Sequence, residues 1–363
     1  MKKVVLLIAL LITSFVSCRK DLLEEPAAPA PGNNRDVVFD LDSVPYATLS
    51  HYQFFSGDLA ALEPASGVLP YEPITPLFSD YAHKKRFIWM PDSVQATYVS
   101  DSSVLSFPEG TVFIKNFYYD HVQPFETRQI VETRLLYRKN GTWQFADYIW
   151  NTEQTEATFS LAGAYAPVIY RNEEDELRCI TFRIPSGVDC HTCHKLNDQD
   201  VPLGPKPQNL NSNYPYADGT MNQLEKWEQV GYLAPGYPTN INTTVKWDDP
   251  TQDMEQRVRA YLDMNCAHCH SAGRHCDYRP MRFAWQETTD PVNLGVCVVP
   301  QDPIAPTQTH IISSGFAGRS MMVHRMGATD EAVRMPLLGR SVVHEEAVEL
   351  ITTWINSLNP PCP

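Results

Sequence analysis

The feature that most constrains this chain is a C-x-x-C-H run that occurs twice, at 190–194 and at 266–270. Two thiols three positions apart can each add to one vinyl group of a haem, and the histidine that follows then lies under the iron. Because histidine makes up 11 of 363 residues, a histidine after both pairs would arise by chance roughly once in a thousand sequences. The pattern therefore predicts two covalent c-type haems. Their expected ligands are Cys190, Cys193 and His194 for the first and Cys266, Cys269 and His270 for the second.

A C-x-x-C pair can also be a redox dithiol or half of a zinc site. The pairs of a zinc ribbon lie about 15–20 residues apart. Here the two pairs begin 76 residues apart, so haem attachment is favoured over a shared zinc ion. His191 and His268 stand between the thioether cysteines and are expected to point away from the haems.

The N-terminus has the pattern of an export signal. Two lysines precede an apolar run over 4–12, which is too short to span a bilayer as a stable helix. A small residue before Cys18 is typical of a bacterial lipoprotein cleavage site, and an ordinary secretory signal cut nearby is the alternative. We expect a signal peptide over 1–17, lipidation of Cys18, and an extended tether over 18–36. The protein would then lie on the periplasmic side of a bacterial membrane or at the cell surface.

The charge of the chain restricts its partners. The formal charge of −14 becomes −16 once the two signal lysines are removed, and haem propionates would add to it. Nucleic acid and anionic lipid headgroups are therefore not expected as partners, whereas a basic redox protein would be attracted.

Nine cysteines also fit export. Lipid would take Cys18 and the haems would take four, which leaves Cys179, Cys276, Cys297 and Cys362. An even remainder in an oxidising compartment suggests two disulfides, and four cysteines allow three connectivities. The most local pairing is Cys276 with Cys297, which leaves Cys179 with Cys362.

Residues 37–186 are expected to form an antiparallel β-sandwich or barrel-like domain. Short runs of β-branched and aromatic residues alternate there with turn signals, and Asn140-Gly141 predicts a tight hairpin turn. Tryptophans of this region are expected in its core rather than on a ligand platform. The expected strands are 87–90, 111–119, 135–139, 142–145, 168–170 and 179–182.

Residues 187–245 are expected to form a loop-rich segment around the first haem, because no amphipathic helix leads into Cys190. The candidate sixth ligand of that iron is Met221. The alternatives are one of the upstream histidines, His51, His83 or His121, or an iron with an open sixth position.

Residues 246–363 are expected to form a mostly α cytochrome c domain, so the fold class as a whole is α+β with several domains. Apolar residues at helical spacing lead into Cys266, and a second amphipathic run covers 347–358. Met335 is the candidate sixth ligand of the second haem, and a core-filling role is its alternative. Arg334 and Arg340 would either pair with haem propionates or be solvated.

With these residues, the chain resembles an uncharacterised family of bacterial dihaem c-type cytochrome lipoproteins. The likeness covers most of the mature chain, and 334–339 with 354–355 are similar to cytochrome modules attached to bacterial sugar dehydrogenases. It implies electron transfer outside the inner membrane, with a redox protein such as a periplasmic dehydrogenase as partner, and it names no substrate. Besides the two motifs, the stretches that carry it are 76–81, 132–136, 184–186, 208–211 and 222–225.

Three functions are compatible with these patterns. An exported dihaem electron carrier would link a periplasmic or surface redox partner with the respiratory chain. A dihaem peroxidase or oxidase would need an open iron at the first haem and a distal acid–base residue. In the third, the β domain is a docking or glycan-binding module and the haems serve a partner enzyme.

Overall fold

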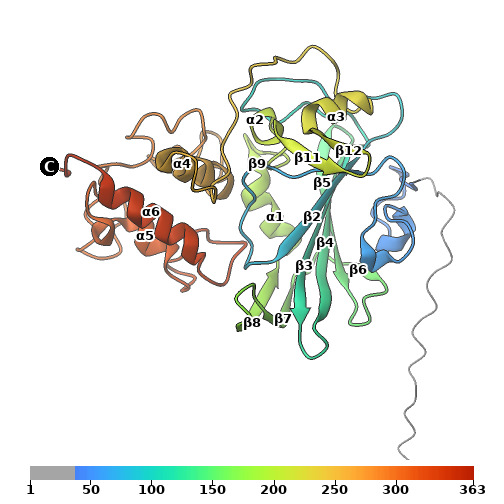
Figure 1. Cartoon of the computed structure of the whole chain (residues 1–363), viewed down its shortest axis with the longest axis horizontal. Coiled ribbons are helices and arrows are strands. Elements are labelled where there is room, and N and C mark those ends of the chain that lie inside the picture. The colour runs from blue at the N-terminus through green and yellow to red at the C-terminus, as the bar shows by residue number, and fades with distance from the viewer. Residues whose placement is uncertain (1–36) are drawn as a thin grey trace, which may run out of the picture.

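The computed structural model describes residues 37–363, and an eight-stranded antiparallel sheet is its largest element (Figure 1). Its strands are β1 (Leu69–Pro70), β2 (His83–Trp89), β3 (Val112–Val122), β4 (Thr127–Lys139), β5 (Thr142–Trp150), β6 (Ala157–Phe159), β7 (Ala164–Arg171) and β8 (Leu177–Ile184). They pair in the order β1–β2–β3–β4–β5–β6, and β7 pairs with both β3 and β8. The strands expected over 37–186 thus lie in one sheet rather than in the two sheets of a sandwich.

Local signals account for the hairpin between β4 and β5. Lys139 of β4 pairs with Thr142 of β5, so the connection has two residues. Asn140 and Gly141 both have positive φ, 54° and 76°, as a type I′ turn requires. The hairpin predicted from Asn140-Gly141 is therefore present.

Both faces of the sheet are buried, by different parts of the chain. Successive side chains of a strand point to opposite faces, so Ile114 and Leu135 pack on residues 44–68, which include η1 (Leu49–Tyr52) and η2 (Leu59–Ala61). Phe113 and Leu136 point the other way. They contact the segment that carries the first motif, and this second face supplies one wall of the candidate site.

Residues 187–245 contain more regular structure than the sequence predicted. Figure 1 shows α1 between the sheet and the C-terminal region, with α2 and α3 beyond one end of the sheet. The elements are α1 (Gly187–His194), β9 (Lys195–Leu196), β10 (Gln199–Asp200), α2 (Pro207–Leu210), β11 (Asn213–Tyr216), β12 (Gly219–Asn222) and α3 (Gln223–Gln229).

The prediction of a mostly α cytochrome c domain over 246–363 is wrong, and with it the α+β fold class. This region has α4 (Met254–Asn265), α5 (Met321–Met326) and α6 (Glu345–Ser357), of 12, 6 and 13 residues. Turns, loops and the short η3 (Ala317–Arg319) make up the rest. The helical periodicity before Cys266 and near the C-terminus is real, but the intervening chain holds prolines that cannot donate the helical hydrogen bond. The described chain is mainly antiparallel sheet and loop.

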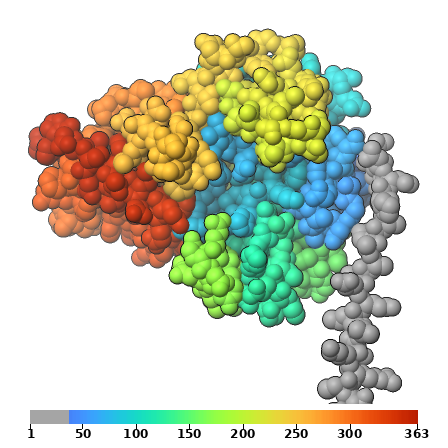
Figure 2. Space-filling model, in the orientation of Figure 1, coloured from blue at the N-terminus to red at the C-terminus, as the bar shows by residue number. Residues whose placement is uncertain are grey.

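The C-terminal region packs tightly against the sheet region, as Figure 2 shows for its orange and red residues. Within it, α4 lies on α6, and Leu262 and Ile351 meet in a shared apolar core with Trp354. No helix among residues 37–363 is long and apolar enough to cross a membrane. The predicted signal peptide over 1–17, the lipidation site Cys18 and the tether over 18–36 fall outside the residues that the structure describes.

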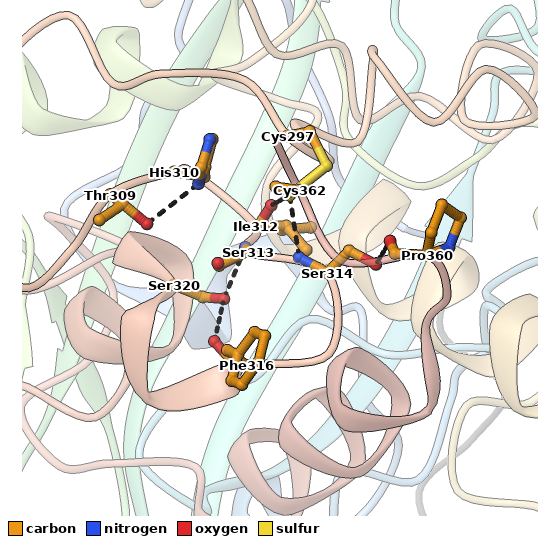
Figure 3. The surroundings of a disulfide bond; sticks show 10 residues. All are labelled: Cys297, Thr309, His310, Ile312, Ser313, Ser314, Phe316, Ser320, Pro360 and Cys362. Atoms are coloured by element: carbon orange, nitrogen blue, oxygen red, sulfur yellow. Dashed lines mark hydrogen bonds between the residues drawn. A yellow bond between two sulfur atoms is a disulfide. The ribbon is translucent and has the colours of Figure 1, made fainter.

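One disulfide closes the C-terminal region, and its pairing differs from the prediction. Cys297 is bonded to Cys362, whereas Cys276 and Cys179 are free thiols. The predicted pairs Cys276–Cys297 and Cys179–Cys362 are therefore wrong. Figure 3 shows that the chain after α6 returns to the 312–314 segment, where the Ser314 amide donates to the sulfur of Cys362 at 3.2 Å. Closeness in sequence did not decide the pairing, because the terminal helix brings a distant cysteine back.

Candidate functional site

The two C-x-x-C-H motifs meet in space. The sulfurs of Cys193 and Cys269 and a ring nitrogen of His268 all lie within 4.8 Å of one another. The first motif is carried by α1 and the second directly follows α4. Their residues are 76 positions apart along the chain, so only the packing of the C-terminal region against the sheet brings them together.

The first motif lies within a helix whose start is fixed by a capping box. The Asp189 amide donates to the Ser186 hydroxyl at 3.4 Å, and the Ser186 amide donates to the Asp189 carboxylate at 2.9 Å. Residues three and four positions apart share one face of a helix, so Cys190, Cys193 and His194 point the same way. The loop predicted here is therefore a helix, because the capping box starts it without any apolar periodicity before the motif.

The ring of His194, the predicted iron ligand of the first motif, is held by a hydrogen bond and is largely desolvated. Its Nδ1 lies 2.8 Å from the carbonyl oxygen of Val201. A carbonyl only accepts, so Nδ1 carries the proton and Nε2 is left free to bind iron. Burial lowers the pKa of His194 to about 4, so the ring is neutral at pH 7, as a ligand must be.

A cavity extends from the first motif to the sheet. Cys190, Cys193 and His194 line one side of it, and Phe113, Leu136 and Phe145 are among the residues on the other. The Phe145 ring stands edge-on to the His194 ring, with centroids 5.1 Å apart. Side chains of this kind exclude water, which suits the flat apolar body of a porphyrin.

Met221, the predicted sixth ligand of the first iron, lies outside this cavity. Met221 lies in β12, paired with Tyr214, and does not line the cavity. His51, His83 and His121 do not line it either. The methionine that does is Met264, which is buried near the end of α4. Met264 was not predicted, because in the sequence it is one more apolar residue of a helix.

A second cavity surrounds the second motif. Cys266, Cys269 and His270 line it together with Met335, the predicted sixth ligand. Burial lowers the pKa of His270 to about 4, and its buried Nδ1 has no hydrogen-bond partner among residues 37–363. Four further methionines line the same cavity, which makes it unusually rich in sulfur: Met281, Met321, Met322 and Met326.

Arg340 holds the Met335 loop in place. Its guanidinium donates twice to the carbonyl of Met335, at 2.8 and 3.1 Å, and also to the carbonyls of Ala328 and Val342. Arg334 is likewise buried and donates to Leu337 and Glu331. The two arginines are therefore not solvated. Their donors are largely occupied by the protein itself, which favours a positioning role over pairing with propionates.

The 76–81 stretch, which was noted only for the family resemblance, connects the sheet region to the residues around both cavities. The carboxylate of Asp80 accepts from the Ser341 amide at 2.6 Å and from the Val342 amide at 3.1 Å. The Phe78 amide donates to Asn265, the residue just before Cys266, at 2.8 Å. These contacts position the loop next to Arg340 and the start of the second motif.

Asp263 links the segment after the first motif to α4. Its buried carboxylate accepts from the ammonium of Lys206 at 3.0 Å and from the Trp285 amide at 3.0 Å. The side-chain amides of Gln208 and Asn209 donate to the same carboxylate at 3.5 and 3.4 Å. The 208–211 stretch of the family resemblance therefore has a structural role between the two motifs.

Asp263→Asn is expected to lower the free energy of unfolding by roughly 3 kcal/mol, because it leaves the charge of Lys206 uncompensated in a largely buried place. The new amide would also face the donors of Gln208 and Asn209. Urea unfolding measures the change. Asp248→Asn is the matched control, since the Lys246–Asp248 pair is exposed and should matter by under about 1 kcal/mol. Equal effects of the two substitutions would contradict the structural role of Asp263.

A scan against protein-family models found no match, and searches against curated proteins and against solved structures found none either. The chemistry of this chain is therefore inferred from the residues of the two motifs and from their surroundings.

Proposed function

We propose that the chain is an exported dihaem c-type cytochrome that transfers electrons between a periplasmic or surface redox partner and the respiratory chain. The observation that supports this most is the meeting of the two C-x-x-C-H motifs, within 4.8 Å at Cys193 and Cys269. A bound haem would supply an iron that stores and releases one electron. Two such sites that begin side by side suit the passage of an electron through the protein.

The chain's own residues would fit that group in specific ways. Cys190 and Cys193, and Cys266 and Cys269, are free thiols available for thioether bonds. His194 and His270 are held neutral by burial, and the Val201 carbonyl fixes the tautomer of His194. Met335 lines the second cavity together with His270. A thioether ligand there would favour Fe(II) and raise the reduction potential.

Mass spectrometry of the protein tests haem attachment. Intact protein produced in an exporting host with haem maturation should carry two haems. Cys190→Ala and Cys266→Ala should each weaken attachment at one site and leave the other intact. Cys179→Ala is the matched control, because Cys179 is an exposed free thiol outside both motifs. A wild-type mass with one haem or none would refute the dihaem proposal.

A metal site without haem is the second candidate, and the same cluster favours it. Two thiols and an imidazole within 4.8 Å could hold zinc or copper. His268→Ala separates the two candidates. In a dihaem cytochrome both haems should still attach, since His268 belongs to neither set of predicted ligands. In a Cys193–His268–Cys269 metal site, elemental analysis should instead show that the bound metal is lost.

The peroxidase or oxidase alternative depends on the first iron. It would need an open sixth position there, whereas Met264 lines that cavity and offers a ligand. Electron paramagnetic resonance of the oxidised protein reports the spin state of each iron. Two low-spin signals would favour the electron carrier, and one high-spin signal would favour the peroxidase or oxidase.

A further inference from the structure

A row of charged side chains crosses the sheet opposite the first motif. Register pairs Arg86 of β2 with Lys115 of β3, Lys115 with Arg134 of β4, and Arg134 with Asp147 of β5. Residues paired directly across strands point to the same face, so these four side chains stand side by side. All four line the cavity that contains Cys190 and His194.

Two cations of this row lack a full set of partners. Arg86 is 6% exposed, yet its Nη2 has no hydrogen-bond partner among residues 37–363. Its Nη1 lies 3.6 Å from Glu72, a carboxylate that is itself more than half exposed. The ammonium of Lys115 lies 4.7 Å from the centroid of the Phe117 ring and forms no hydrogen bond or ion pair within the described chain.

The acidic residues nearby do not balance these charges. Glu132 is fully buried and is used by Arg134, whose Nε donates to it at 3.0 Å. Both carboxylate oxygens of Asp147 are buried without a partner. Burial, reinforced by Glu132, raises the pKa of Asp147 well above its usual range, which favours the uncharged form of this carboxyl and makes it a weak counter-ion. Lys115 therefore lacks a counter-ion within the described chain and Arg86 has only one, a carboxylate that is more than half exposed, and buried charge without a counter-ion is costly. Burial and the neighbouring cations accordingly lower the pKa of Lys115 well below its usual range, and a bound carboxylate would favour its charged form.

The neighbouring Lys84 differs from Arg86 and Lys115, because it has a hydrogen-bond partner and does not line the cavity. Lys84 stands on the same strand and the same face as Arg86. Its ammonium donates to the Ala82 carbonyl at 2.8 Å, and Lys84 does not line the first cavity. Lys84 is thus satisfied within the protein, whereas Arg86 and Lys115 present donors to the cavity.

We propose that Arg86 and Lys115 bind carboxylate groups in the first cavity, and that the carboxylates are the propionates of the first haem. This rests on the proposed function, because a haem attached at Cys190 and Cys193 would share the cavity with this row. Guanidinium and ammonium groups are the usual partners of carboxylates in partly buried sites. A free small carboxylate has the same chemistry, so the two sources need separate tests.

The test compares Arg86→Gln and Lys115→Gln with the matched control Lys84→Gln. Intact mass first establishes how many haems each protein carries. If the row binds propionates, removal of a nearby positive charge should lower the midpoint potential of one haem in both test variants. The control and the wild type should agree. Should Lys115→Gln fail to fold, as judged by thermal melting, Lys115→Met replaces it with a side chain of similar length.

Calorimetric titration with sodium acetate tests whether the site binds a free small carboxylate. This test does not depend on haem. If the site takes a free carboxylate, the wild type should bind acetate, and both test variants should bind it at least tenfold more weakly. The proposal is overturned if neither potential nor acetate binding distinguishes the test variants from Lys84→Gln. A wild-type mass without haem would refute the proposed function separately, and acetate binding would then decide the carboxylate site alone.

Discussion

Met335→Ala is expected to remove the proposed sixth ligand of the proposed second haem, with His270 left as the only proposed protein ligand on that iron. The sulfur-to-iron charge-transfer band of the oxidised protein should weaken or vanish. The midpoint potential should fall, because the thioether that favours Fe(II) is gone. Met335→His should keep the iron low-spin and still lower the potential. Absorption spectra and redox titration of the purified variants measure both effects.

Four other methionines line the same cavity, so the assignment to Met335 needs a control. Met281→Ala removes a thioether from the same cavity and should leave the band and the potential as in the wild type. If Met335→Ala leaves both unchanged, another residue is the ligand, and Met326 is the next to replace. Arg340 supports the choice of Met335, because two of its hydrogen bonds hold the Met335 carbonyl.

Cys362→Ala is expected to lower the free energy of unfolding by about 4 kcal/mol. The Cys297–Cys362 disulfide closes a loop with a sequence separation of 65, and the chain-entropy model gives about this value for a loop of that length. Cys297→Ala should have the same effect. Denaturant unfolding under non-reducing conditions measures both, provided that haem content is matched between the proteins.

The free thiols provide the control for this disulfide. Cys276→Ala and Cys179→Ala should change stability by much less, since neither sulfur is bonded to another. Peptide mapping without reductant should find Cys297 joined to Cys362. A peptide that joins Cys276 to Cys297, together with a large loss of stability in Cys276→Ala, would contradict the structure and restore the most local pairing.

Short-range patterns in the sequence were reliable where the physics is short-range. The Asn140-Gly141 turn needs only two residues that tolerate positive φ, and it is present. Helices α4 and α6 were visible because apolar residues recur at helical spacing. Met335 was predicted as a ligand because it precedes a proline in a loop after the second motif; it lines the second cavity, and its ligand role stays a prediction.

Tertiary packing decided everything that joins distant parts of the chain. No local pattern predicts that Cys193 lies beside Cys269, or that Cys362 reaches Cys297. Met221 was predicted as the sixth ligand of the first iron from its distance along the chain, yet it does not line the first cavity. Distance along the chain says little about which cavity a side chain enters. The charged row that contains Arg86 and Lys115 exists only through the register of four strands, β2 to β5. The sequence by itself determined which groups can bind a haem or a metal, and the fold determined which of them face one another, since each contact depends on residues far away in the chain.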